Sequence, residues 1–120
     1  MTKFDKILNK LLDQTARKKI TWFYFSVFQY PNSFPFSDDN DLVSEESYFY
    51  PFENGNFTLS TFTSDKSDKK AETKLILGYG EDNSDEFQII SKEQSKLFEL
   101  KYLIERKRDV SDALDSFLNN

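Results

Sequence analysis

The aromatic run from Ile20 to Tyr30 is the feature of this sequence that most constrains its fold. Aromatic and β-branched residues dominate the run, a composition typical of a β-strand. Because successive side chains of a strand point to opposite faces, Phe23 and Phe25 share one face, and Trp22 and Tyr24 share the other. Both faces are too apolar for a sheet with water on one side. The rest of the chain must cover both faces or leave an apolar surface exposed.

An amphipathic helix is predicted before this run. Thr2 is a suitable N-cap for a helix over residues 3–17. Its apolar residues recur at helical spacing and form one stripe: Phe4, Ile7, Leu8, Leu11 and Leu12.

A pair of helices is predicted after the strands. Ser91, with Gln94 three residues later, forms a capping box for the first of them. Asp109 or Ser111 is expected to cap the second. Each helix has an apolar face of its own: Leu97, Leu100 and Ile104 in the first, and Val110, Ala113, Leu114, Phe117 and Leu118 in the second.

Four more strands are predicted between the helices, over residues 47–52, 57–63, 73–79 and 87–90. The pair Asn54-Gly55 is a strong hairpin signal between the first two of these. Consecutive strands joined by short turns favour an antiparallel meander. We therefore predict one α+β domain over residues 1–120: a meander sheet of four to five strands, with the N-terminal helix and the C-terminal helical pair packed on one face.

Composition excludes several chemistries. The chain has no histidine and no cysteine, so catalytic triads, thiol nucleophiles, thiolate metal sites and disulfides are ruled out. We predict no enzymatic activity and no cofactor. The net charge of −5 disfavours general binding to nucleic acid or anionic membranes. The longest apolar stretch, within residues 20–28, is far short of a membrane span, and the first residues lack an apolar signal core, so we expect a cytoplasmic protein.

An acidic loop is predicted over residues 31–46, and it is longer than most connections in a compact domain. We expect its acidic side chains to steer a basic partner: Asp38, Asp39, Asp41, Glu45 and Glu46. A calcium loop starting at Asp39 fails, because Val43 and Tyr50 stand where oxygen ligands are required. Gly78 and Gly80 lack the third glycine of a dinucleotide motif, and we interpret them as turn formers.

The aromatic strand supplies the main functional hypothesis. If the helices cover the Phe23 and Phe25 side, then Trp22 and Tyr24 face away from the core. Tyr48 and Tyr50 alternate in the same way on the next strand, so the four rings would form one surface. Trp and Tyr are preferred anchors of protein interfaces. The alternative is that the loop over residues 31–46 folds over this surface and makes it a second core.

The function predicted from these patterns is binding or inhibition of another protein, with a basic or nucleic-acid-binding protein as the expected kind of partner, and a homodimer is also compatible with them. One alternative is a small-ligand or divalent-metal site between sheet and loop. Another is phosphate or nucleic-acid binding by two basic clusters, Arg17–Lys19 and Arg106–Arg108, provided that the two helix ends meet. Cations at helix C-termini are the simpler interpretation of both clusters.

The overall layout resembles small accessory proteins of low-GC Gram-positive bacteria and their phages. The resemblance lies in the aromatic meander, the closing helical pair, the segment from Lys19 to Trp22 and the pattern of the first helix: Phe4, Ile7, Leu8, Leu11, Leu12 and Thr15 at their observed spacing. It implies a bacterial or phage origin and an accessory, non-enzymatic role. Because the resemblance is one of pattern, it transfers no functional residue.

Overall fold

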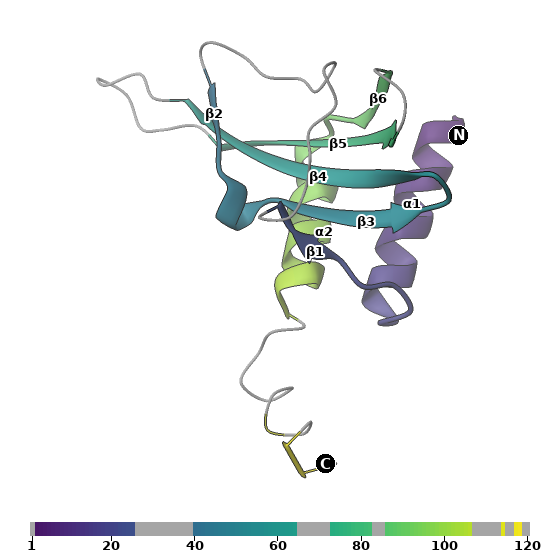
Figure 1. Cartoon of the computed structure of the whole chain (residues 1–120), viewed down its shortest axis with the longest axis vertical. Coiled ribbons are helices and arrows are strands. Elements are labelled where there is room, and N and C mark those ends of the chain that lie inside the picture. The colour runs from purple at the N-terminus through teal and green to yellow at the C-terminus, as the bar shows by residue number, and fades with distance from the viewer. Residues whose placement is uncertain are drawn as a thin grey trace.

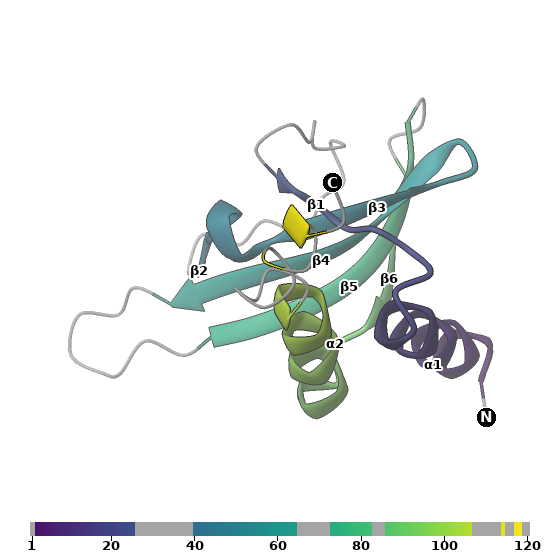
Figure 2. The ribbon, with the colours of Figure 1, turned by 90° about the horizontal axis from the view of Figure 1, so that it is seen from below.

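In the computed structural model, two helices lie on one side of an antiparallel sheet (Figure 1, Figure 2). Helix α1 (Lys3–Ala16) precedes the sheet and helix α2 (Gln94–Arg106) follows it. The two helices contact each other, and they also contact β6 and β5 respectively. The predicted α+β class is confirmed. The structure describes residues 2–25, 40–64, 73–82, 86–106, 114 and 117–118.

Five strands form a continuous antiparallel path in the order β1-β3-β4-β5-β6, and β2 pairs with β4 off this path. The predicted meander is therefore confirmed from β3 to β6. The strands are β1 (Phe23–Tyr24), β2 (Asn40–Leu42), β3 (Tyr48–Phe52), β4 (Gly55–Ser64), β5 (Thr73–Glu81) and β6 (Phe87–Ser91).

The start of α1 confirms the predicted N-cap. The Thr2 hydroxyl accepts a hydrogen bond from the Asp5 backbone N–H at 3.1 Å, and the Asp5 carboxylate accepts one from the Thr2 N–H at 3.2 Å. These bonds lower the pKa of Asp5, since they favour its charged form. The helix ends at Ala16, one residue before the predicted end.

The capping box predicted at Ser91 and Gln94 is wrong. The Gln94 amide instead pairs with the main chain of β5: its Nε2 donates to the Leu75 carbonyl, and its Oε1 accepts from the Leu75 N–H, both at 2.8 Å. The β5–β6 ladder reaches only to the Leu77–Ser91 pair. Gln94 therefore satisfies the backbone groups of β5 where β6 no longer pairs with them.

Within the described part of the predicted aromatic strand, residues 20–25, only Phe23 and Tyr24 belong to β1. Residues 26–30 lie outside the described residues. The same holds for most of the second helix of the predicted closing pair. Leu114, Phe117 and Leu118 are helical and exposed, but the predicted packing of that helix on the sheet falls outside what the structure describes.

A row of side chains across the helix-covered face forms the centre of the core. Tyr48, Leu59 and Leu77 are register partners on three adjacent strands. None of the three is more than 2% exposed. The helices and neighbouring strands complete this cluster with Leu8, Leu11, Trp22, Leu75, Ile90, Leu97, Leu100 and Ile104.

The predicted direction of the aromatic face is wrong for Trp22 and Tyr48. The ring pairs Trp22–Tyr50 and Tyr24–Tyr48, with centroids 5.9 and 5.5 Å apart, confirm that the four residues share one face. That face is the one the helices cover, so Trp22 and Tyr48 are only 5% and 2% exposed. The physical reason is that the leucines of β4 and β5 lie on this same face, and burying them requires the helices there.

The opposite face has a smaller buried cluster of Phe25, Phe49 and Phe62. Next to it, Gly78 lies inside β5, so its interpretation as a turn former is wrong. A Cβ at this position would lie 2.3 Å from the Phe87 ring. The glycine is therefore needed because the Phe87 ring packs directly over the strand.

Within the described residues, none of the helices has the length and apolar character needed to cross a membrane.

The Thr15→Val variant should be less stable than the wild type by about 1–3 kcal/mol, the typical effect of leaving a buried donor unpaired. The indole N–H of Trp22 donates to the buried Thr15 hydroxyl at 3.0 Å, and valine cannot accept this bond. Urea unfolding, followed by Trp22 fluorescence, measures the change. Thr73→Val, at an exposed position of β5, is the matched control. Equal stability of the two variants would contradict the prediction.

Candidate functional site

Aromatic rings form a row where the β3–β4 hairpin extends past α1. Tyr50, Phe57 and Tyr79 are register partners on β3, β4 and β5. Their ring centroids are 6.2 Å apart for the first pair and 4.8 Å apart for the second. Phe52 extends the row toward the hairpin tip and is 48% exposed. The row is therefore only partly covered by the chain.

The side of α1 that faces this row leaves a hollow between helix and hairpin. Two adjoining hollows of about 390 and 460 Å³ share Ile7, Phe52 and Phe57 in their walls. We call the two together the aromatic groove. From α1 it is also lined by Lys3 and Lys10, which lie close to one face of the helix with Ile7.

The groove owes its shape at the hairpin to a glycine. Gly55 has no positive φ, and the tight turn is made instead by Glu53, whose φ is 56°. A Cβ on Gly55 would lie 2.4 Å from the Gly80 carbonyl oxygen and 2.7 Å from the Tyr79 hydroxyl. Because Gly55 has no Cβ, the Tyr79 hydroxyl reaches the Phe52 carbonyl and donates a hydrogen bond to it at 2.8 Å. The predicted hairpin is confirmed, but its glycine serves close packing.

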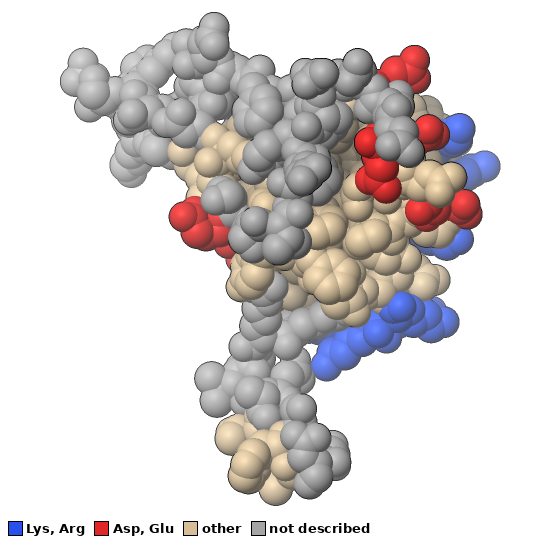
Figure 3. All heavy atoms as spheres, viewed as in Figure 1, with Lys and Arg blue, Asp and Glu red and all other residues tan. Residues whose placement is uncertain are grey.

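Opposite charges flank the groove. Lysines of α1 lie along the edge of the molecule behind the hairpin, and acidic side chains lie around the hairpin tip (Figure 3). Glu53, Glu81 and Asp82 are exposed there. Burial raises the pKa of Tyr79, and these three carboxylates raise it further by disfavouring a second negative charge. Tyr79 therefore stays a neutral hydrogen-bond donor.

The four aromatic residues predicted as a contact surface are thus separated by the fold. Trp22 and Tyr48 belong to the core, and Tyr24 is 42% exposed over Tyr48. Only Tyr50, which is half-buried, lines the aromatic groove. Trp22 contacts the groove indirectly through the Tyr50 ring.

The predicted acidic loop is only partly described. Asp38 and Asp39 lie outside the described residues, and Asp41 is in β2, opposite Thr63. Glu45 and Glu46 are exposed in a short 3₁₀ helix, Ser44–Glu46.

This 3₁₀ helix is fixed to the sheet and to α2. The buried Ser47 hydroxyl donates to the Val43 carbonyl at 2.7 Å and accepts from the Thr61 N–H at 3.0 Å. Glu46 forms an ion pair with Lys101 of α2 at 3.3 Å. The contacts that the structure describes for Glu46 and Ser47 therefore hold the 3₁₀ helix against the sheet and α2.

A series of hydrogen-bonded side chains on the helix side of the sheet connects the core residue Tyr48 to this ion pair. The Tyr48 hydroxyl donates to Glu105 at 3.0 Å, and Lys101 donates to the same carboxylate at 3.0 Å. Burial and the hydrogen bond to Glu105 raise the pKa of Tyr48 well above its ordinary value of 10.0. Burial lowers the pKa of Lys101, but its pairing with Glu105 and Glu46 outweighs this effect and raises it overall.

The ends of the two helices meet, which was the condition for a joint basic patch. The Arg106 guanidinium donates to the Ala16 carbonyl at 3.3 Å. Arg17 is engaged by Asp13 at 2.9 Å, a pair that lies exposed on α1. Lys107 and Arg108 lie outside the described residues. Among the residues described, no group of acidic side chains is placed to hold a metal ion.

Sequence reasoning missed most of the groove, namely Ile7, Phe52, Phe57 and Tyr79. A signal was available in the strand alternation. By strand alternation, Tyr50, Phe57 and Tyr79 point to the same face of the sheet as the core leucines. They lie closer to the hairpin end of their strands than those leucines do. Comparison with known proteins gave no match: no family model, curated protein or solved structure is significantly similar to this chain.

Gly55→Ala should destabilise the protein by about 1–3 kcal/mol, the usual effect of inserting a methyl group where no space exists. The new Cβ would press on the Gly80 carbonyl and displace the Tyr79 hydroxyl from Phe52. Urea unfolding measures the loss. Asn54→Ala, one residue earlier in the exposed loop, should change stability by less than about 0.5 kcal/mol. Similar values for both variants would contradict this account of the hairpin.

The unfolding free energy of the wild-type chain should fall as the pH rises above about 10. The folded state holds Tyr48 protonated, so its contribution is complete below the ordinary pKa of 10.0 and is lost as pH rises toward the raised value. One such phenol gives a slope of up to about 1.4 kcal/mol per pH unit. The raised pKa of Lys101 acts with the same sign.

Tyr48→Phe should reduce this alkaline slope, although at neutral pH it costs about 1 kcal/mol for the lost hydrogen bond to Glu105. Urea unfolding at several values of pH measures both effects. Tyr102→Phe, at a ring that is 64% exposed on α2, should keep the wild-type slope. An unchanged slope in Tyr48→Phe would show that Tyr48 is not the group responsible.

Proposed function

We propose that this chain is a non-enzymatic protein-binding module that receives an amphipathic segment of a partner in the aromatic groove. The carrying observation is the open hollow beside α1, walled by Ile7, Phe52 and Phe57 and continued by a row of half-buried rings. Grooves of this kind bind the apolar face of a helix, which presents side chains at every third or fourth residue. Accessory roles in a bacterium or phage, including inhibition of a partner, fit such a module.

The exposed Phe52 ring supports a protein ligand. Nearly half of this ring is exposed at the rim, although it contacts two other aromatic rings. Aromatic side chains that are partly exposed beside other rings are common anchors of interfaces, because they bury a large area with few rotatable bonds. The two hollows adjoin along α1, so they match an elongated ligand better than a compact one.

The charges at the rim indicate the chemistry of that segment. Lys3 and Lys10 line the groove from α1, and neither forms an ion pair within the part of the chain that the structure describes. An apolar face flanked by Asp or Glu would bring carboxylates to these ammonium groups. The α1 side of the groove therefore favours an amphipathic segment with an acidic flank, whereas the sequence alone had suggested a basic partner attracted by the acidic loop.

A display screen of amphipathic helical peptides with varied charge tests this function. The wild-type chain should enrich peptides with an apolar face and an acidic flank. Phe52→Asp should weaken their binding about tenfold to a hundredfold, since losing the burial of one large ring, roughly 1.5–3 kcal/mol, corresponds to that range. Titrations followed by the fluorescence of Trp22, the single tryptophan, give the affinities.

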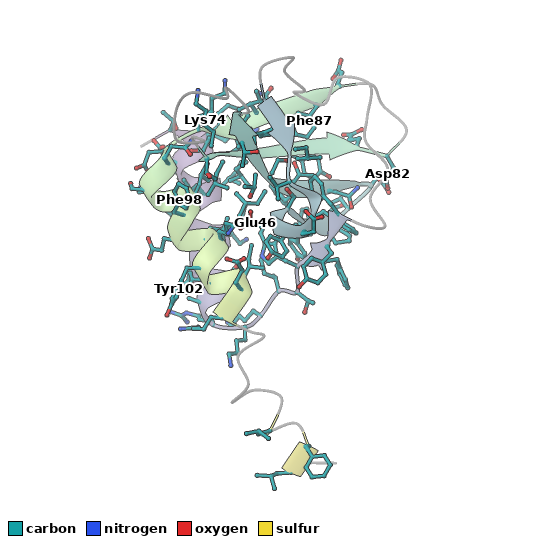
Figure 4. The ribbon with its side chains drawn as sticks, turned by 90° about the vertical axis from the view of Figure 1, so that its left-hand side faces the viewer. Glu46, Lys74, Asp82, Phe87, Phe98 and Tyr102 are labelled. Atoms are coloured by element: carbon teal, nitrogen blue, oxygen red, sulfur yellow. The ribbon has the colours of Figure 1, made fainter. Side chains whose placement is uncertain are left out.

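Tyr102→Asp is the matched control for this test. Tyr102 is an exposed aromatic residue, at 64%, on the side of α2 that faces away from the sheet (Figure 4), and it does not line the groove. This variant should bind the selected peptides like the wild type. A screen that enriches no peptide, or peptides that lose as much affinity with Tyr102→Asp as with Phe52→Asp, would exclude the groove as the binding site.

A further inference from the structure

The structure contains an apolar segment with no cover, in addition to the open groove. Leu114, Phe117 and Leu118 are 58%, 75% and 78% exposed. Large apolar side chains at such exposure are expected to bury themselves against another surface. The groove and this segment therefore both lack an apolar partner within the described structure.

The sequence of this segment has the chemistry that the groove favours. At 100° per residue, residues 110, 113, 114, 117 and 118 occupy one half of a helix. Asp112 falls opposite the centre of this apolar half, and Asp109 and Asp115 lie near its two edges. The apolar half suits the walls of the groove, and one edge aspartate would face the lysines of its rim.

The position of α2 brings the segment to the correct end of the groove. Arg106, the last residue of α2, donates to the Ala16 carbonyl at the end of α1. Gln14, which lines the groove, is on the same final turn of α1. Residues 107–110 can span about 13 Å when extended, and a helix with its side chains is about 10–12 Å wide. The chain is therefore long enough to pass around the end of α1.

The lengths also agree along the groove. A helix over residues 110–118 is about 13 Å long, and α1 between Gln14 and Lys3 spans about 16 Å, at 1.5 Å per residue. A segment entering beside Gln14 would run antiparallel to α1. Only the aspartate at the edge of the apolar half nearest α1 would then lie toward Lys10 and Lys3.

We infer that residues 110–118 dock into the aromatic groove of their own molecule and compete there with the partner segment. This inference rests on the proposed function, because it names an internal ligand for the same site. The exposed state of Leu114, Phe117 and Leu118 is then the open form of the protein. A tethered segment has a high effective concentration, so it lowers the apparent affinity for a partner by the fraction of molecules that are open.

Paramagnetic relaxation in the full chain tests the docking. Because the chain has no cysteine, Asn119→Cys provides a single site for a nitroxide label. The label should broaden the methyl signals of Ile7 and Ile20, which line the groove, and spare Ile76 on the opposite face of the sheet. Adding Leu114→Asp and Phe117→Asp should abolish the broadening.

A mixed sample separates docking within one molecule from docking between two. Isotope-labelled protein without nitroxide, mixed with unlabelled protein that carries it, should show no broadening. Broadening in this mixture would overturn the inference in favour of a second copy as the occupant. Broadening centred on the signals of Phe98 and Tyr102, which are exposed on α2 (Figure 4), would overturn it in favour of a helical hairpin.

A peptide of residues 108–120 distinguishes failure of this inference from failure of the proposed function. If the internal segment occupies the groove in nine of ten wild-type molecules, the peptide should bind the Leu114→Asp/Phe117→Asp variant about tenfold more tightly than the wild type. Equal affinity for both proteins, without broadening in the labelled chain, would refute internal docking and leave the groove as a site for other segments. No binding to either protein would refute this ligand, and the display screen would then decide on the groove itself.

Discussion

The burial of the Trp22 indole between α1 and the sheet is the interaction on which the rest of the arrangement depends. Its N–H is bonded to the Thr15 hydroxyl of α1, and its ring contacts Tyr50 of β3. A buried indole with an unpaired N–H is unfavourable, so this bond fixes where the last turn of α1 meets the sheet. The indole thus links α1 to β3, and its partner Tyr50 lines the aromatic groove.

The second helix is held by a different kind of contact. Leu97, Leu100 and Ile104 bury the apolar face of α2 against the sheet. Around them, Gln94 bonds to the β5 backbone at one end, and Glu105 bonds to Tyr48 toward the other. Apolar burial supplies most of the free energy, while these bonds determine the position and direction of the helix. The hydrogen bonds through Glu105 and Lys101 therefore fix how α2 lies against the sheet and the 3₁₀ helix.

Local patterns predicted the elements well. The apolar stripe and Thr2 cap of α1, the meander from β3 to β6 and the hairpin at Gly55 follow from short-range spacing and turn chemistry. Predictions failed where a side chain acts over a long distance. Gln94 and Gly78 looked like a cap and a turn residue, but their roles are set by Leu75 and Phe87, which belong to other elements. Spacing along one segment carries no information about such contacts.

The sequence by itself determined the helices α1 and α2, the meander from β3 to β6 and the fact that Trp22, Tyr24, Tyr48 and Tyr50 share one face. Strand alternation is a local property, so this grouping required no knowledge of the fold. Only the tertiary structure decided which face the helices cover, and therefore which rings are core and which line the groove. That choice depends on the summed apolar area of all strands, because the face with more leucine is the one that excludes water most favourably.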